Sequence, residues 1–158
     1  MIFTCKTTNL NKAIQTVQRA ISSKPSTPIF SGIHLIADNN ILEIQAMDLN
    51  MAIACSIEAE IQEKGEIVVS AKHFSELMRK LPGENVTIVK NKEEKTINVQ
   101  SDKSDFQLLL MNEDDYPKFP EFNADKQIVL EDEKSRNLLK KLFLPALQTK
   151  QDLCSQVF

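Results

Sequence analysis

Basic side chains in two segments of the chain recur at a spacing of seven residues. The pairs are Lys12 with Arg19, Lys72 with Arg79, and His73 with Lys80. Seven residues are about two turns of an α-helix, so both members of a pair share one helix face. Such a face can neutralise phosphates without reading bases, which is the chemistry of sequence-independent DNA contact. The alternative is that these side chains only solubilise exposed helices.

Basic and acidic residues are segregated along the chain, although the net charge is small. The 19 basic and 22 acidic residues give a net charge of −3, which excludes a protein that is basic over its whole surface. Residues 1–30 contain basic side chains and no acid, whereas residues 31–63 contain acids and no Lys or Arg. Any contact with nucleic acid must therefore use a local patch.

Signatures of catalysis and of metal binding are absent from the sequence. Its three glycines form no phosphate-binding loop, and no His-x-x-x-His or Gly-x-Ser-x-Gly occurs. His34 lies within an apolar run and is interpreted as a packed or surface strand residue, and His73 has no partner acid or cysteine nearby in the sequence. The run 113–115 is acidic but lacks the glycine turn of a calcium loop. We expect no catalytic residue, no metal and no cofactor.

Cysteine usage and hydropathy indicate a cellular compartment. Cys5, Cys55 and Cys154 are an odd, widely spaced set without a Cys-x-x-Cys pair, and the chain opens without a secretory leader. No apolar run approaches the roughly 20 residues of a membrane span. We therefore expect a reducing, cytoplasmic location and no membrane partner.

The succession of predicted elements repeats along the chain. A strand at Ile2–Cys5 precedes a helix whose apolar face carries Leu10, Ala13, Ile14, Val17 and Ile21. Three strands are then predicted at Ile33–Ala37, Ile41–Met47 and Met51–Ile61, with a turn at 38–40. The alternative is that strand–helix patterns recur loosely in any α+β protein.

The second unit has the same order. A strand at Ile67–Val69 and a cap at Ser70 precede a helix with Phe74, Leu77, Met78 and Leu81 on one face, ended by Pro82–Gly83. Three more strands are predicted at Val86–Val89, Thr96–Gln100 and Phe106–Met111. After an acidic, proline-containing linker at 112–125, a third unit begins with a strand at Ile128–Leu130 and a helix at Arg136–Phe143.

Several separated segments resemble the bacterial DNA polymerase III β subunit family, the sliding clamps. They are Met1-Ile2-Phe3-Thr4-Cys5, 15–21, Pro28-Ile29-Phe30-Ser31-Gly32-Ile33, Ala46-Met47-Asp48-Leu49, Val69-Ser70-Ala71-Lys72, Arg79-Lys80-Leu81-Pro82 and Tyr116-Pro117-Lys118-Phe119-Pro120. The resemblance runs in register from residue 1 to about residue 141, and several motifs in order are far more specific than any one of them.

The resemblance implies a fold and a function. The fold is α+β, the DNA-clamp fold, with a duplicated β-α-β-β-β unit whose two helices pack against antiparallel sheets. The function is that of a non-catalytic processivity factor in DNA replication, which encircles duplex DNA and tethers the replicative polymerase. In the family, two three-domain protomers close into a homodimer ring, and the partners are double-stranded DNA, the polymerase III α subunit and the clamp loader.

The resemblance also implies site residues. DNA-binding residues are expected at Lys12, Arg19, Lys24, Lys72, His73 and Arg79. A protomer interface is expected at Phe74, Leu77, Lys103, Phe106 and Leu108. Asp105 departs from the basic residues that usually flank this strand in the family.

The resemblance predicts three segments. The N-terminal clamp domain spans 1–124, the start of a second domain spans 125–141, and 142–158 is an aberrant tail. Read one base out of frame, the codons of 151–158 permit Arg-Pro-Leu-Leu-Thr-Gly-Val, a family sequence. We therefore expect a frameshift near the A-rich codons of Lys140 and Lys141, and a truncated clamp that cannot close a ring.

Two other functions remain open. The chain could be a short interaction protein that docks on full-length clamps through the exposed edge strand at Phe106. It could also be an unrelated small enzyme, which requires a cluster of polar side chains that the sequence does not show.

Overall fold

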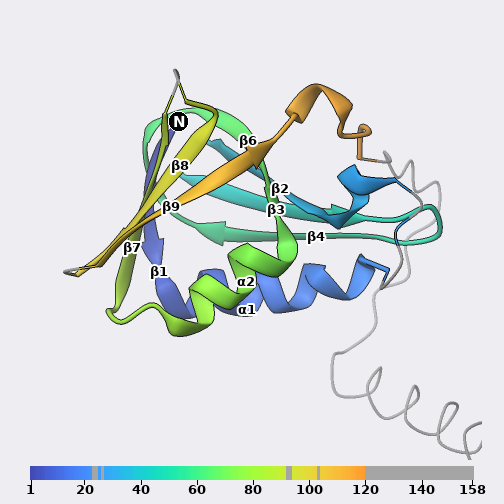
Figure 1. The fold of residues 1–158 in the computed structure, drawn as a ribbon. Helices are drawn as coiled ribbons and strands as arrows, with labels where there is room; N and C mark the ends of the chain where they lie inside the picture. The colour runs from blue at the N-terminus through green and yellow to red at the C-terminus, as the bar shows by residue number, and fades with distance from the viewer. Residues whose placement is uncertain (23–24, 26, 92–93, 103, 120–158) are drawn as a thin grey trace, which may run out of the picture. The chain divides into compact units, whose positions relative to one another are not determined.

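The computed structural model describes residues 1–22, 25, 27–91, 94–102 and 104–119 (Figure 1). The described residues lie within Met1–Pro120, the first of the two parts into which the chain divides. The strand and helix predicted after residue 125 and the boundaries at 124/125 and 141/142 lie outside the described residues.

The predicted repeat is present in the structure. The first unit contains β1 (Ile2–Lys6), α1 (Thr7–Val17), β2 (Gly32–Asp38), β3 (Ile41–Met47), β4 (Ala52–Glu58) and β5 (Glu60–Glu63). The second contains β6 (Gly65–Ser70), α2 (Ala71–Lys80), β7 (Asn85–Asn91), β8 (Thr96–Ser101) and β9 (Ser104–Met111). Short 3₁₀ turns, η1 (Gln18–Ala20), η2 (Pro28–Ser31) and η3 (Glu113–Asp115), complete the elements that the structure describes.

The two units exchange their first strands. The described strands form one antiparallel sheet in the order β4-β3-β2-β6-β9-β8-β7-β1-β5. In this order β1 pairs with β7 of the second unit, with Phe3 opposite Ile88, and β6 pairs with β2 of the first, with Leu35 opposite Ile67. Each unit therefore completes the sheet of the other, and the two units form one core.

The helices lie side by side on one side of the sheet (Figure 1). The apolar stripes predicted from the sequence face inward: Leu10, Ile14 and Val17 of α1 and Phe74 of α2 have no exposed surface, and Met78 is 1% exposed. α1 starts after Lys6 and α2 starts after Ser70, so equivalent positions in the two helices are 64 residues apart. Leu10 thus corresponds to Phe74, and Ile14 to Met78.

Three predicted details differ in the structure. The first helix ends at Val17 instead of reaching Ile21, because the chain tightens into η1 and Ile21 becomes extended. The predicted strand Met51–Ile61 is divided at Ala59, whose N–H donates to Asn40 O at 3.1 Å, so β4 and β5 pair with different neighbours. Ser70 occupies the predicted cap position of α2, but its side chain makes no capping hydrogen bond.

Replacing Phe74 with alanine tests the shared core. Phe74 is fully buried, so Phe74→Ala should lower the free energy of unfolding by about 3–5 kcal/mol in urea titrations. Leu109→Ala is the matched control, because Leu109 is 78% exposed and its truncation should change stability by about 0.5 kcal/mol or less. Equal effects of the two substitutions would contradict the assignment of α2 to the core.

Candidate nucleic-acid interface

Five of the six predicted DNA-binding residues lie exposed on the helical side of the molecule. Lys12 is on α1, Arg19 is in η1, and Lys72, His73 and Arg79 are on α2. Lys24 lies outside the described residues. Because α1 ends before Arg19, the seven-residue spacing does not place Lys12 and Arg19 on one continuous helix face, as the sequence predicted. The pair on α2 retains its helical spacing.

The positive charges of these side chains are not paired with carboxylates of the described residues. Within the described part of the chain, no carboxylate forms an ion pair with Lys12, Arg19, Lys72 or Arg79; the pairs that form involve the amino terminus, His34, Lys64 and Lys90. Lys80, which the spacing pairs with His73 but the resemblance does not include among the DNA-binding residues, is also exposed on α2. Free ammonium and guanidinium groups on adjacent helices can contact successive phosphates.

Of the acidic residues that the structure describes, all but one lie outside α1 and α2. Glu58 on β4, Glu60 on β5 and Glu66 on β6 are exposed. The helices carry a single acid, Glu76. The two helices thus carry more basic than acidic side chains.

The last strand of the second unit presents an open edge. Only the end of β9 pairs with β6, where Leu110 is opposite Val69 and Met111 is opposite Val68. Leu110 N donates to Lys95 O at 2.9 Å, on the side of β8. Because backbone groups of a strand alternate in direction, Asp105, Gln107 and Leu109 direct theirs to the side away from β8. This edge can accept another strand.

Apolar side chains accompany that edge. Phe106 is 43% exposed and Leu109 is 78% exposed, whereas Leu108 is half-buried against the core. A pocket of about 340 Å³ lies between the edge and the start of α2; its lining comprises Val69, Ser70, His73 and 107–111. The sequence analysis missed Leu109, although the period-two alternation of a strand with Leu108 and Leu110 inward would have placed it outward.

The structure revises the predicted protomer interface. Phe74 has no exposed surface, so it is a core residue that no partner can touch, and its prediction as an interface residue is wrong. Leu77 is half-buried and remains a candidate, while Lys103 lies outside the described residues. The Asp105 carboxylate accepts a hydrogen bond from Gln100 Nε2 at 3.2 Å, a partner within the same hairpin.

His34 contributes to packing, as the sequence predicted. Its Nε2 lies 3.0 Å from Glu66 Oε2, and its ring lies 5.0 Å from the ring of Tyr116. Burial raises the pKa of the Tyr116 hydroxyl to about 12. Lys90 Nζ donates to both carboxylate oxygens of Glu113, at 3.0 and 2.9 Å. These contacts anchor the segment after β9 on the sheet.

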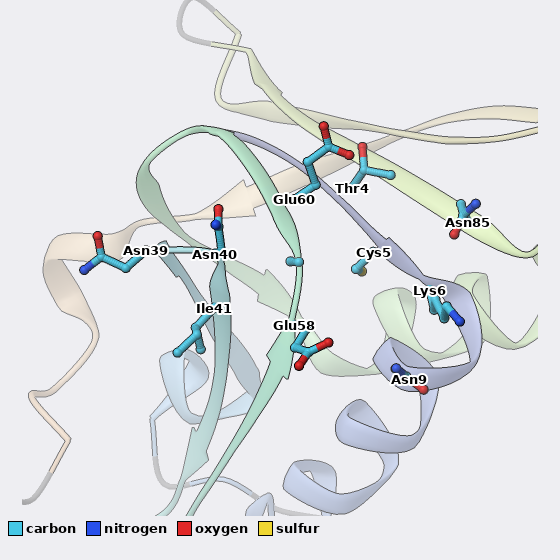
Figure 2. Close-up of a pocket in the computed structure, with 11 residues that line it drawn as sticks. Thr4, Cys5, Lys6, Asn9, Asn39, Asn40, Ile41, Glu58, Glu60 and Asn85 are labelled. Atoms are coloured by element: carbon cyan, nitrogen blue, oxygen red, sulfur yellow. The ribbon is translucent and has the colours of Figure 1, made fainter.

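A second pocket, of about 850 Å³, lies where β1 and β4 diverge (Figure 2). Figure 2 shows Lys6 and Asn9 on one side and Asn40 and Glu58 on the other. Cys5 is the only thiol in its lining, and burial raises the pKa of that thiol from 9.0 to about 12. The protonated thiol is a poor nucleophile. The pocket therefore offers no thiolate nucleophile, although amide and carboxylate side chains line it.

Two further observations concern metals and membranes. Across the part of the chain that the structure describes, no group of three or more His, Cys, Asp or Glu side chains is placed to hold a metal ion. Within the same residues, no helix is both long and apolar enough to cross a membrane.

Residues 1–120 match the family described as DNA polymerase III beta subunit, N-terminal domain. The chain belongs to this family. The expected α+β clamp fold is also confirmed by solved structures. The sliding clamp from Bacillus subtilis superposes with a TM-score of 0.75 at 29% identity, covering 78% of this chain and 34% of that one. The clamp from Caulobacter crescentus gives 0.72 at 29% identity, with coverages of 78% and 34%.

Two curated relatives are longer than this chain. The beta sliding clamp of Bacillus subtilis (strain 168) is 30% identical over 148 residues, which cover 89% of this chain and 39% of the relative. The beta sliding clamp of Synechocystis is 28% identical over 133 residues, covering 80% of this chain and 34% of the relative. The chain thus spans between about a third and two fifths of the length of these relatives.

The buried thiol gives a chemical test of the pocket. At pH 8, Cys5 of the folded chain should react with iodoacetamide on the order of a hundred- to a thousandfold more slowly than in urea, because burial raises its pKa from 9.0 to about 12. Peptide mass spectrometry after timed quenching measures this rate at Cys5. Similar rates in the folded and unfolded chain would show that the Cys5 thiolate is accessible. Such a thiolate would supply a nucleophile and would favour the enzyme hypothesis.

Proposed function

We propose that the chain supplies the N-terminal domain of a DNA sliding clamp, a non-catalytic processivity factor for the replicative polymerase. The observation that carries this proposal is the pair of adjacent helices with unpaired basic side chains, beside strands with exposed acids. In a family of sliding clamps, this arrangement supports contact of α1 and α2 with duplex DNA. The DNA-binding residues of the proposal are Lys12, Arg19, Lys24, Lys72, His73 and Arg79.

Electrostatic contact suits a protein that moves along DNA. Positive side chains release counterions from phosphates whatever the sequence, so every position along the duplex is equivalent. The polymerase is then held by topology and not by tight binding to one site. The proposed partners of the whole clamp are double-stranded DNA, a second protomer that closes the ring, the polymerase III α subunit and the clamp loader.

The open edge of β9 is the proposed protomer interface. Phe106 and Leu108, with Leu77 of α2 and Lys103, form the revised set. The free backbone groups of Asp105, Gln107 and Leu109 can pair with a strand of the neighbouring protomer. The domain that supplies this edge is proposed to extend from residue 1 to 124, followed by the start of a second domain at 125–141.

The same edge favours a second candidate function. A chain that carries one clamp domain can dock on a full-length clamp through Phe106 and interfere with ring closure. The exposed apolar side chains of β9 support this candidate, because single edge strands are templates for added strands.

Charge reversal on the helices tests the DNA contact. The triple variant Lys12→Glu, Arg19→Glu and Lys72→Glu should lose measurable binding to a random-sequence duplex at low salt, as followed by fluorescence anisotropy. For the unmodified chain, the logarithm of the affinity should fall linearly with the logarithm of the salt concentration. The slope of this line should be about −0.9 for each phosphate contacted.

A matched triple variant serves as the control. Lys64→Glu, Lys95→Glu and Lys118→Glu change the net charge equally but lie between strands or in the segment after η3. This variant should keep most of the binding. Equal losses in the two variants would mean that net charge, and not the helical face, governs the interaction.

Mixing with an intact clamp tests the edge. The chain should sediment as a complex with the Bacillus subtilis beta sliding clamp, and Phe106→Asp should weaken that complex roughly tenfold or more, because burial of a Phe side chain is lost. Ile41→Asp is the control, since Ile41 is 49% exposed at the start of β3. Absence of any complex would refute the docking candidate.

A further inference from the structure

We propose that Glu76 limits the affinity of the helical face for DNA phosphates, because its unpaired carboxylate occupies the centre of the basic surface of α2. This inference rests on the proposed function, since it assumes that α2 faces DNA. It assigns a role to a residue of the opposite charge from those expected to bind.

The helical wheel places Glu76 among the basic side chains. At about 100° per residue, the exposed residues of α2 follow one another around the helix in the order Arg79, Lys72, Glu76, Lys80 and His73. Together they span about 120°, and Glu76 lies at the middle of this arc. Any phosphate that approaches Lys72 and Lys80 together therefore approaches Glu76 as well.

The Glu76 carboxylate forms no close ion pair with its neighbours in the described part of the chain. Glu76 lies four residues from both Lys72 and Lys80, which is the spacing of helical ion pairs, yet it pairs with no basic group that the structure describes. It is the sixth residue of a ten-residue helix, beyond the first turn where an acid stabilises the helix dipole. The helix dipole therefore does not explain an acid at this position.

The internal repeat shows that the fold does not require an acid there. With the 64-residue offset that relates Leu10 to Phe74, the position equivalent to Glu76 is Lys12. Both side chains are exposed at the same place in their helices. One unit thus carries a positive charge where the other carries a negative one.

The expected consequence is a weaker, more uniform attraction. Coulomb's law in water gives about a two- to sixfold change in affinity for one unit charge at 4–8 Å from a phosphate. A lower affinity shortens the lifetime of each contact with a phosphate, while the surrounding lysines still attract the DNA. For a protein that must move along a duplex, lower affinity at each position permits faster exchange between phosphates.

Two substitutions at this position test the inference. Glu76→Gln should bind a random-sequence duplex about two- to sixfold more tightly than the unmodified chain, measured by fluorescence anisotropy across a salt series. Glu76→Lys should bind more tightly still, and its salt slope should be steeper by about 0.9, as for one added phosphate contact. Glu60→Gln and Glu60→Lys, on exposed β5, make the same charge changes as matched controls.

The outcomes separate this inference from the proposed function. If the unmodified chain binds DNA but Glu76→Gln binds no more tightly than Glu60→Gln, the role of Glu76 is refuted and the DNA contact stands. If neither the unmodified chain nor Glu76→Lys binds duplex at low salt, the proposed function fails and the inference fails with it. Urea titrations should show unchanged stability in Glu76→Gln, so that a change in affinity reports on charge alone.

Discussion

Exchange of first strands between the two repeated units is the constraint on which the remaining structure depends. β1 completes the sheet of the second unit and β6 completes that of the first, so neither half of the domain has a finished sheet alone. Each exchanged strand leads directly into a helix, which fixes both helices on the same side of the sheet. Burial of Leu10 and Phe74 at equivalent positions then turns the opposite helix faces, with their basic side chains, toward solvent. The arrangement of charge is thus a consequence of the topology.

The two repeated units have similar backbones but different side chains at equivalent surface positions. Lys12 and Glu76 occupy equivalent positions with opposite charges, and the pocket beside Lys6 and Asn9 corresponds to the one beside Ser70 and His73. The first pocket is lined largely by amides and carboxylates, and the second by the apolar end of β9. Differences between equivalent positions are informative because the fold imposes the same local geometry on both. Comparing equivalent positions therefore distinguishes residues that the packing of the fold requires from residues that only alter the chemistry of the surface.

The sequence predicted the repeat well because its signals are local. Helical stripes such as Leu10–Ile14–Val17, the turn at Asn39–Asn40 and the stop at Pro82–Gly83 depend on neighbouring residues alone, and all are present in the structure. Predictions that depended on tertiary packing were less accurate. The resemblance placed Phe74 at a protomer interface, yet this residue of the apolar stripe is completely buried. The break at Ala59 arises from a hydrogen bond to the distant Asn40. The backbone of β9 is left unpaired at Leu109 because β6 pairs only with Leu110 and Met111. No local sequence pattern encodes where this pairing stops.

Duplex DNA is proposed to contact the side of the molecule formed by α1 and α2. Amide chemical shifts of the ¹⁵N-labelled chain, recorded during titration with a random-sequence duplex at low salt, test this contact residue by residue. We expect shifts concentrated at the exposed positions of both helices, including Lys12, Lys72 and Arg79, and little change along β3 and β4. Shifts concentrated on those strands, or distributed evenly over the domain, would contradict it.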